Sequence, residues 1–296
     1  MKGSLKYSLL LVLTALIWGS AFVAQSEGMD HVGPMTFICI RFIIGGLFLI
    51  PIISIFDSRK KKEDITPWSD KSLIKGGVIC GVFLFLAASL QQIGIKYTAV
   101  GKAGFITAFY IVLVPIFSLF LKKKPGKYIW VSVVIAVAGL YLLCIEPGSG
   151  FDLKAADLLL FACAVLFSFQ IMAADKYAPM VDPLKLASIE FLVTGVLGIV
   201  PMILEKPILS DIAGAWLPLG YAAFFSSGIA YTLQMVAQSR VKPAVASLLM
   251  SLESVFSVIF GFIILHEVLT VRQGVGCIIM FVAIVIAQFE PKGSEK

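Results

Sequence analysis

Charged residues are scarce in this chain of 296 residues, since they make up only 14% of it. A typical soluble domain contains about 25% charged residues, so this chain has too few to cover a surface that faces water. The hydrophobic share is high, at 59%, and the mean hydropathy is +0.98. These values exclude an ordinary soluble protein and predict a chain that is embedded mainly in lipid.

Cysteine and histidine are also scarce, and their positions exclude the common metal and catalytic sites. The five cysteines all lie in apolar runs without a CxxC pair, so neither a disulfide framework nor a zinc site has the spacing it needs. The only histidines, His31 and His266, lie in short predicted loops, and the chain has no HExxH, P-loop or GxSxG motif. We therefore expect no metal, no cofactor and no enzyme activity.

Apolar runs, by contrast, are plentiful and of nearly uniform length. Most are about 17 to 23 residues long, which as helices would cross a hydrocarbon core of about 30 Å. The sequence therefore predicts an all-α integral membrane protein with ten transmembrane helices and no separate soluble domain. The predicted spans are residues 8–24, 34–56, 73–95, 103–121, 128–145, 155–174, 184–204, 215–237, 244–265 and 274–289.

The basic residues predict how the chain is threaded through the bilayer. Most of the 24 Lys and Arg residues fall in loops on one side, among them the run from Arg59 to Lys62 and the run from Lys122 to Lys124. Because cytoplasmic loops are enriched in Lys and Arg, we expect a multi-pass protein of the cell membrane with both termini in the cytoplasm. This asymmetry explains the net charge of +6, so we expect the lipid bilayer, and no nucleic acid, as a partner.

An internal repeat relates the two halves of the chain. Pro34 and Gly46 recur 149 residues later as Pro183 and Gly195, and Gln91 recurs 143 residues later as Gln234. The repeat predicts two five-helix units, residues 1–147 and 148–296, and it indicates that the first apolar run is a retained helix rather than a cleaved signal peptide. Because five is odd, the second unit must enter the membrane inverted. Inverted repeats are typical of secondary transporters.

Polar side chains deep within the predicted spans are the candidates for a site, because they are costly in lipid. Glu253 lies about ten residues into the ninth span, near the midplane, where we expect it to bind substrate or a proton or to contact a neighbouring helix. In the eighth span, Ser227, Tyr231, Gln234 and Gln238 follow α-helical spacing. This stripe fits either the wall of a wet cavity or hydrogen bonding between helices.

Further candidates lie in the other spans. Gln91, Tyr110 and Gln170 are polar at depth, and Trp18 lies mid-span beside Gly19, where it could shape a pocket or pack tightly.

Two charges and one proline suggest gating roles. Arg41 and Glu190 occupy equivalent repeat positions and could form an ion pair or be two separate charges that snorkel toward the membrane surfaces. Pro115 could let the fourth helix bend, although a static kink is the simpler interpretation.

Several short motifs resemble the EamA family of the drug/metabolite transporter superfamily. They are residues 17–20 (IWGS), 41–42 (RF), 92–98 (QIGIKYT), 102–107 (KAGFIT), 114–115 (VP), 251–253 (SLE) and 266–270 (HEVLT). The resemblance covers the whole chain. It implies two inverted five-helix repeats around a central cavity and transport of small metabolites such as amino acids. Family members often have proline after the glutamate of the ninth helix, where this chain has Ser254.

The sequence thus predicts a secondary transporter, most simply an exporter of small organic metabolites such as amino acids, that works by alternating access. Its partners would be a small-molecule substrate, lipid and a possible coupling proton; cargo, direction, coupling and oligomeric state stay open. A membrane-embedded enzyme or a ligand sensor without transport is the alternative. The expected substrate-binding residues are Trp18, Gln91, Tyr110, Gln170, Tyr231, Gln234 and Glu253.

Overall fold

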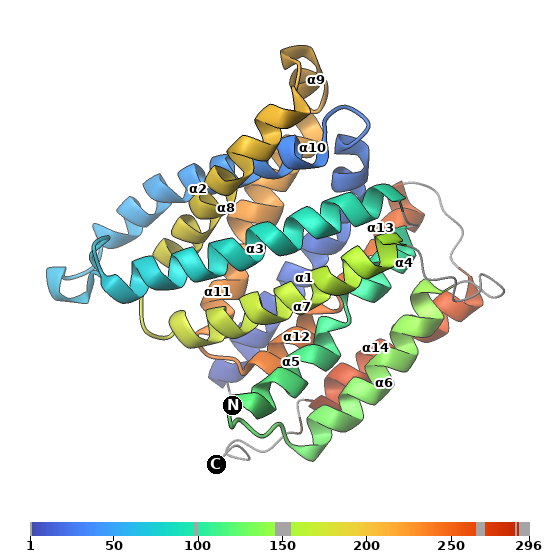
Figure 1. The fold of residues 1–296 in the computed structure, drawn as a ribbon. Helices are drawn as coiled ribbons and strands as arrows, with labels where there is room; N and C mark the ends of the chain where they lie inside the picture. Colours follow the sequence, from blue (N-terminus) through green and yellow to red (C-terminus); the bar gives the residue numbers. More distant parts are fainter. Residues whose placement is uncertain (1, 98–99, 146–154, 265–269, 288, 290–296) are drawn as a thin grey trace.

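The computed structural model describes residues 2–97, 100–145, 155–264, 270–287 and 289. Throughout these residues the regular structure is helical, without β-strands. Figure 1 shows the helices packed side by side into one bundle, with α3 (Lys71–Tyr97) crossing its face between α8 (Pro183–Glu205) and α7 (Ala155–Tyr177). The predicted all-α membrane fold is confirmed.

The ten predicted spans correspond to ten helical passes within the described ranges. The first five are α1 (Lys2–Gly28), α2 (Pro34–Asp57), α3, the pair α4 (Val100–Thr107) and α5 (Tyr110–Phe120), and α6 (Lys127–Cys144). The second five are α7, α8, a composite of α10 (Trp216–Tyr221), η2 (Ala222–Tyr231) and α11 (Thr232–Gln238), the pair α12 (Pro243–Met250) and α13 (Glu253–Ile264), and α14 (Val271–Ala287). Two short helices, η1 (Lys62–Asp64) and α9 (Leu209–Gly214), lie in connections.

Seven of the described passes are long and apolar enough to cross a membrane on length and composition alone. The helical segments Lys127–Leu143 and Val271–Ala287 are apolar but shorter, and the eighth pass is divided because η2 is a π-helix. The first helix runs to Gly28, four residues beyond the predicted end of its span.

The inverted repeat is visible where α2 crosses α8. The two helices run in opposite directions, because Thr36 at the start of α2 contacts Glu205 at the end of α8. At the crossing, a Cβ on Gly46 would meet Leu192, and a Cβ on Gly195 would meet Ile43. Ile43 and Leu192 are themselves 149 residues apart, so these two close approaches are equivalent contacts.

Two side-chain hydrogen bonds at this crossing obey the same symmetry. Ser188 Oγ donates to the carbonyl of Gly46 over 3.0 Å, and the equivalent Cys39 Sγ donates to the carbonyl of Gly195 over 3.3 Å. An approximate twofold axis therefore passes between α2 and α8, as expected for two inverted five-helix repeats. The proposed boundary between the units, at residues 147 and 148, lies outside the described residues.

Polar contacts hold α2 and α8 together at both ends of the crossing. At one end the Glu205 carboxylate accepts hydrogen bonds from the backbone N–H groups of Met35 and Thr36, at 2.8 and 2.7 Å. At the other end Lys185 Nζ lies 2.6 Å from Asp57 Oδ2. Lys60 bridges Asp57 and Asp182, and the hydrogen bond to Asp182 raises the pKa of Lys60, which favours its charged form.

We expect the change Glu205→Ala to lower the free energy of unfolding by about 1–2 kcal/mol, because it leaves the first N–H groups of α2 without their acceptor. Thermal unfolding of the detergent-purified protein measures this loss. Glu27→Ala is the matched control, since Glu27 is an exposed carboxylate near the same end of the bundle. Equal unfolding temperatures for the two variants would show that the cap contributes nothing.

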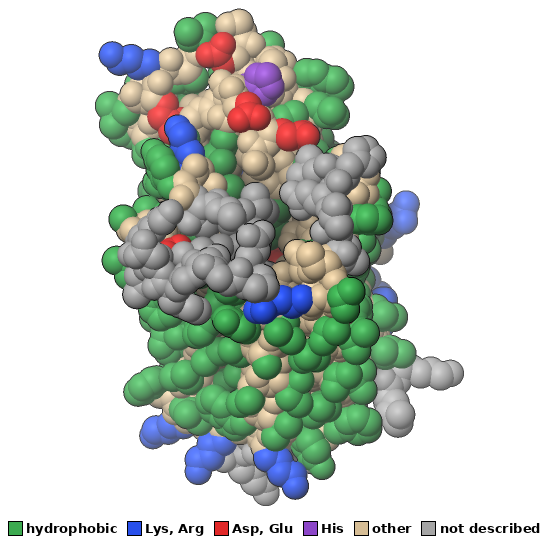
Figure 2. Space-filling view, turned by 90° about the vertical axis from the view of Figure 1, so that its right-hand side faces the viewer, with side chains coloured by type: hydrophobic (Ala, Val, Ile, Leu, Met, Phe, Trp, Pro, Cys, Tyr) green, Lys and Arg blue, Asp and Glu red, His purple; other side chains and the backbone are tan. Residues whose placement is uncertain are grey.

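The outer surface is largely apolar, as a lipid-facing surface should be. Figure 2 shows hydrophobic side chains over the middle and lower part of one face, with Lys and Arg at its lower edge and acidic side chains near its top. At the edge of the bundle, α6 and α14 lie side by side (Figure 1). A close packing contact joins them at Gly139 and Gly276.

Candidate functional site

A cavity lies at the centre of the bundle, lined by residues from both halves of the chain. Its volume is about 40 Å³, enough for about three waters. Its lining combines aromatic, amide and charged side chains: Trp18, Phe22, Gln25, Arg41, Gln91, Tyr110, Phe167, Gln170, Ile171, Ser226, Tyr231, Gln234, Met250 and Glu253. All seven predicted substrate-binding residues are therefore brought together in one place, although their role in binding stays a prediction.

Tyr110 and Glu253 face one another across this cavity. Tyr110 Oη donates a hydrogen bond to Glu253 Oε1 over 3.0 Å, and both side chains are buried. The two residues are 143 residues apart, so they are equivalent positions of the repeat. The approximate twofold axis therefore passes close to this hydrogen bond, as it does to the contact between the equivalent rings of Phe42 and Phe191.

Both residues begin the second part of an interrupted helix. The fourth span is interrupted between α4, which ends at Thr107, and α5, which begins at Tyr110; the ninth is interrupted between α12, which ends at Met250, and α13, which begins at Glu253. The backbone makes tight i to i−3 hydrogen bonds there, such as Ile111 N to Ala108 O. Interrupted helices near the midplane commonly mark transport sites.

Pro115 does not account for the interruption. It lies buried within α5, five residues beyond Tyr110, and does not line the cavity. The equivalent residue of the ninth span is Val258, yet that span is interrupted at the same position. Ser254 likewise replaces the expected proline without removing the interruption. A gating role for Pro115 stays a prediction.

Aromatic rings and a buried cation form one wall of the site. The ring of Trp18 lies 4.5 Å from that of Tyr231 between centroids, and Tyr231 also packs against Phe42 and Phe191. The guanidinium of Arg41 lies 4.6 Å from the Phe42 ring centroid, within the range of a cation–π contact.

The neighbour of Trp18, Gly19, serves tight packing. A Cβ there would lie 2.5 Å from Phe256 Cβ, so the glycine allows α1 to approach α13 next to Glu253. Because Gly19 has no side chain, α1, which carries Trp18, can lie close to Glu253.

A chain of hydrogen bonds between polar side chains begins at the cavity and runs between the helices. Gln170 Nε2 donates to Glu190 Oε1 over 2.8 Å, and Gln234 Nε2 donates to Gln170 Oε1 over 3.1 Å. Gln234 also donates to Gln238, which in turn donates to the carbonyl of Ile171. The chain joins α7, α8 and α11, so both interpretations of the polar stripe apply, with Gln234 on the cavity and Gln238 between helices.

Arg41 and Glu190 do not form an ion pair in this conformation of the described residues. Glu190 accepts from Gln170, while Arg41 lines the cavity with its Nε atom buried and without a hydrogen-bond partner. The two charges are separate, but the expectation that they snorkel is wrong, because Arg41 is 2% exposed and Glu190 is 0% exposed.

The π-helix η2 changes which serine faces the cavity. In an α-helix Ser227, four residues before Tyr231, would share its face, but a π-helix makes i to i−5 hydrogen bonds and aligns residues about five apart. Ser226 accordingly lines the cavity, and its carbonyl accepts from Trp18 Nε1 over 3.4 Å. Ser227 is buried but is not part of the lining, so the α-helical stripe predicted for this span is wrong at that position.

Sequence reasoning missed several lining residues that the repeat could have identified. Phe22 and Gln25 follow Trp18 on the same face of α1, one and two turns later, but Gln25 lies just beyond the predicted end of the span. Phe167 and Ile171 are the repeat equivalents of Trp18 and Phe22. The residues that the structure describes hold no cluster of His, Cys, Asp or Glu suited to a metal ion, and the family motif at His266 and Glu267 lies outside them.

A family model and several named proteins match the chain. The model of the EamA-like transporter family matches twice, at residues 5–145 and 154–288. An uncharacterized transporter from Archaeoglobus fulgidus is 31% identical over 93% of this chain and 83% of its own length. The threonine/homoserine exporter RhtA of Escherichia coli K12 is 27% identical over 90% of this chain and 85% of its own length.

A solved structure shares the fold. A protein crystal structure matches with a TM-score of 0.76 and 20% sequence identity, covering 95% of this chain and 96% of that one. At this identity the match supports the fold alone.

Proposed function

Since the chain belongs to the EamA-like transporter family, we propose that it exports small organic metabolites such as amino acids across the cytoplasmic membrane by alternating access. The named relatives are transporters, and the chain is a multi-pass membrane protein of the same kind. RhtA is named as an exporter of threonine and homoserine, which supports amino acids as the first solutes to test.

The observation that carries the proposal is the Tyr110–Glu253 hydrogen bond at the junction of the two halves. It joins equivalent residues at the interruptions of two equivalent helices, inside a buried polar cavity. A movement of one half relative to the other would change this contact. That is the property expected of a central site in an inverted-repeat transporter.

Glu253 is proposed to bind the ammonium group of a substrate or to carry a coupling proton. Its side chain is only 5% exposed, and a carboxylate at this depth is costly unless a cation, a proton or hydrogen-bond donors compensate it. Tyr110 supplies one donor. Gln91, Gln170 and Gln234 would form the polar wall, and Trp18 and Tyr231 an aromatic surface for the apolar part of a solute.

The size of the cavity supports alternating access rather than a permanent channel. A volume of about 40 Å³ holds a few waters but lies far below the roughly 300 Å³ of the smallest common ligand pockets. A metabolite would therefore need the halves to separate on one side at a time. We propose the units 1–147 and 148–296 as the moving parts, with both termini in the cytoplasm.

Reconstitution into proteoliposomes tests the proposal. We expect saturable movement of at least one radiolabelled amino acid, with threonine and homoserine tested first, in vesicles with and without a pH gradient. Protein-free vesicles are the control. Binding without movement of any solute would favour a sensor, and a chemically altered product would favour a membrane-embedded enzyme; either result contradicts transport.

A further inference from the structure

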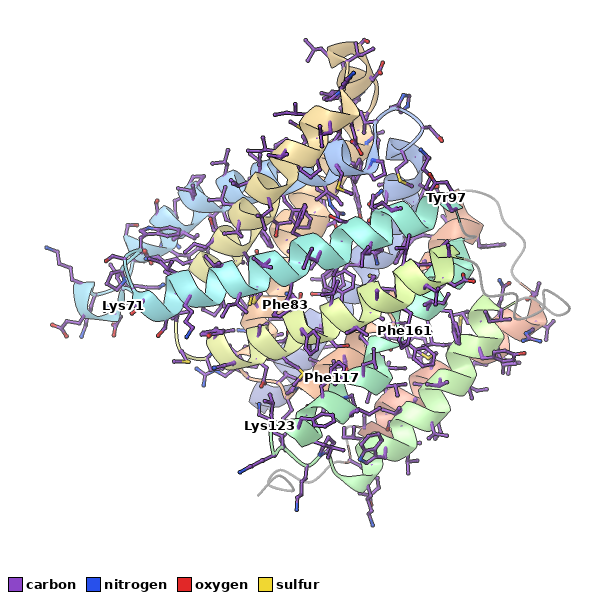
Figure 3. All side chains as sticks on the ribbon, in the orientation of Figure 1. Lys71, Phe83, Tyr97, Phe117, Lys123 and Phe161 are labelled. Atoms are coloured by element: carbon purple, nitrogen blue, oxygen red, sulfur yellow. The ribbon has the colours of Figure 1, made fainter. Side chains whose placement is uncertain are left out.

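A second, apolar hollow opens on the lipid-facing side of the bundle, between α4, α6 and α7. Its volume is about 730 Å³, within the range of ligand pockets, and nearly all of its lining is hydrophobic. Phe105 comes from α4, Phe109 from the interruption between α4 and α5, Val134 and Ala138 from α6, and Phe161 from α7. Figure 3 shows Phe161 pointing from α7 toward α6. We refer to this hollow as the lateral groove.

The lateral groove faces the bilayer. Val134 is 69% exposed and Leu158 63% exposed, on helices that cross the membrane or lie at the edge of the bundle. A surface of this kind within the hydrocarbon region is in contact with acyl chains. The groove differs from the rest of the apolar surface because it is concave and can enclose a chain on three sides.

A cation lies at one end of the lateral groove. The guanidinium of Arg272, in the first turn of α14, lies 5.2 Å from the ring centroid of Tyr141, and its Nε donates to the carbonyl of Leu142 over 3.3 Å. Tyr141 and Leu142 both line the groove. The Nη2 atom of Arg272 is buried and has no hydrogen-bond partner among the described residues.

The unpartnered Nη2 atom is significant because a buried donor that makes no hydrogen bond is costly. Among the described residues that line the groove, the charged one is Asp157, in the first turn of α7, where it is buried and already engages another group. The amino terminus of α14 is capped by Thr270 and Gln273, so of the described residues at this end Arg272 is the one with a free donor.

We propose that the lateral groove binds one anionic phospholipid, with an acyl chain in the groove and the phosphate group against Arg272. The apolar lining matches the chain, and the positive charge with its free donor matches the phosphate, which prefers the planar guanidinium fork. Arg272 lies at the membrane boundary, which the first turn of α14 and the end of α6 mark, and the apolar lining lies deeper. A phospholipid places its phosphate and its acyl chains in the same order. This inference does not depend on the solute that the central cavity carries.

The bound lipid would lie directly behind the central site. Phe109 lines the lateral groove, while the next residue, Tyr110, lines the central cavity and bonds Glu253. The groove and the cavity thus share one wall, the interruption between α4 and α5.

Native mass spectrometry of the detergent-purified protein, titrated with dipalmitoyl phosphatidylglycerol, tests the proposal. We expect one saturable bound lipid. Arg272→Gln should weaken its binding about tenfold by removing the charged partner, and Ala138→Trp should weaken it to a similar degree by filling the groove. The matched controls are Lys206→Gln, which removes an exposed cation just after α8, and Val285→Trp, at an exposed position of α14 outside the groove; both variants should bind as the wild type does.

Two probes separate the parts of the ligand. Dipalmitoyl glycerol has the chains without the phosphate, and glycerol 3-phosphate has the phosphate without the chains; each should bind at least about tenfold more weakly than the phospholipid. Equal binding of either probe would overturn the proposal. Wild-type affinity in both Arg272→Gln and Ala138→Trp, or a loss in only one of them, would overturn it as well.

Discussion

Replacing Glu253 with glutamine is expected to lower the initial rate of amino acid transport in proteoliposomes by about 10- to 100-fold. The substitution keeps the shape of the side chain and its ability to accept from Tyr110 but removes the carboxylate. A hydrogen bond to a charged partner contributes about 1.5–3 kcal/mol, which corresponds to that range of rates. The rate is measured with the solute that gives the largest signal for the wild-type protein.

The dependence on pH separates the two proposed roles of Glu253. If the carboxylate carries a coupling proton, Glu253→Gln removes the stimulation of transport by a pH gradient. If it only binds an ammonium group, the variant raises the solute concentration needed for half-maximal transport and keeps the response to the gradient. A variant with the wild-type rate and the wild-type response would refute both roles.

Two further variants show whether the effect belongs to this site. Tyr110→Phe removes one hydrogen-bond donor to Glu253 but keeps the carboxylate itself, so we expect a smaller loss, of about fivefold. Glu27→Gln neutralises an exposed carboxylate and should leave transport unchanged. All variants should unfold at temperatures close to that of the wild type, because a general loss of structure would lower every rate.

Replacing Gly195 with leucine is expected to lower the unfolding temperature by about 5–10 °C. A Cβ at this position would lie 2.5 Å from Ile43 Cγ1 and 3.0 Å from the Ile43 backbone nitrogen, so α2 and α8 would have to move apart. Overpacking of this kind costs about 1–3 kcal/mol, and the crossing also holds the two hydrogen bonds from Ser188 and Cys39. Thermal unfolding in detergent measures the effect.

Gly220→Leu is the matched control, because a Cβ on Gly220 meets no atom within 4 Å. The double variant Gly195→Ala with Ile43→Ala should recover part of the loss seen with Gly195→Ala alone, since it removes the nearer of the two obstacles. If Gly195→Leu and Gly220→Leu unfold at the same temperature, the close crossing of α2 and α8 is not important for stability.

The sequence predicted the fold of this protein closely for a simple physical reason. In lipid every backbone polar group must be bonded within its own segment, so a long apolar run has little choice but to form a helix. The run lengths gave the ten passes, and the odd number of passes in each repeat gave the inversion. Pro34 and Pro183 confirm the pattern, since each begins its helix in the structure.

The candidate site was predictable residue by residue but not as an arrangement. Each buried polar side chain was recognisable by its cost in lipid, which identified Glu253, Gln170 and Gln234. The sequence could not show that Glu253 meets Tyr110, although both stand at the same position of the repeat. It also assumed an α-helical period for the eighth span, and the π-helix η2 placed Ser226 on the cavity instead of Ser227.

The sequence by itself thus determined the membrane environment, the ten passes and the symmetry between the halves, because these depend on hydrophobic length and on the numbering of equivalent residues. Only the tertiary structure decided which polar groups share one cavity, that Arg41 and Glu190 stay apart, and that Arg272 lies at the end of an apolar groove. These outcomes depend on how far one helix is rotated and shifted against another. Contacts such as those of Gly46 and Gly195 set that rotation. Each of these contacts joins two different helices, so the sequence of one span does not reveal it.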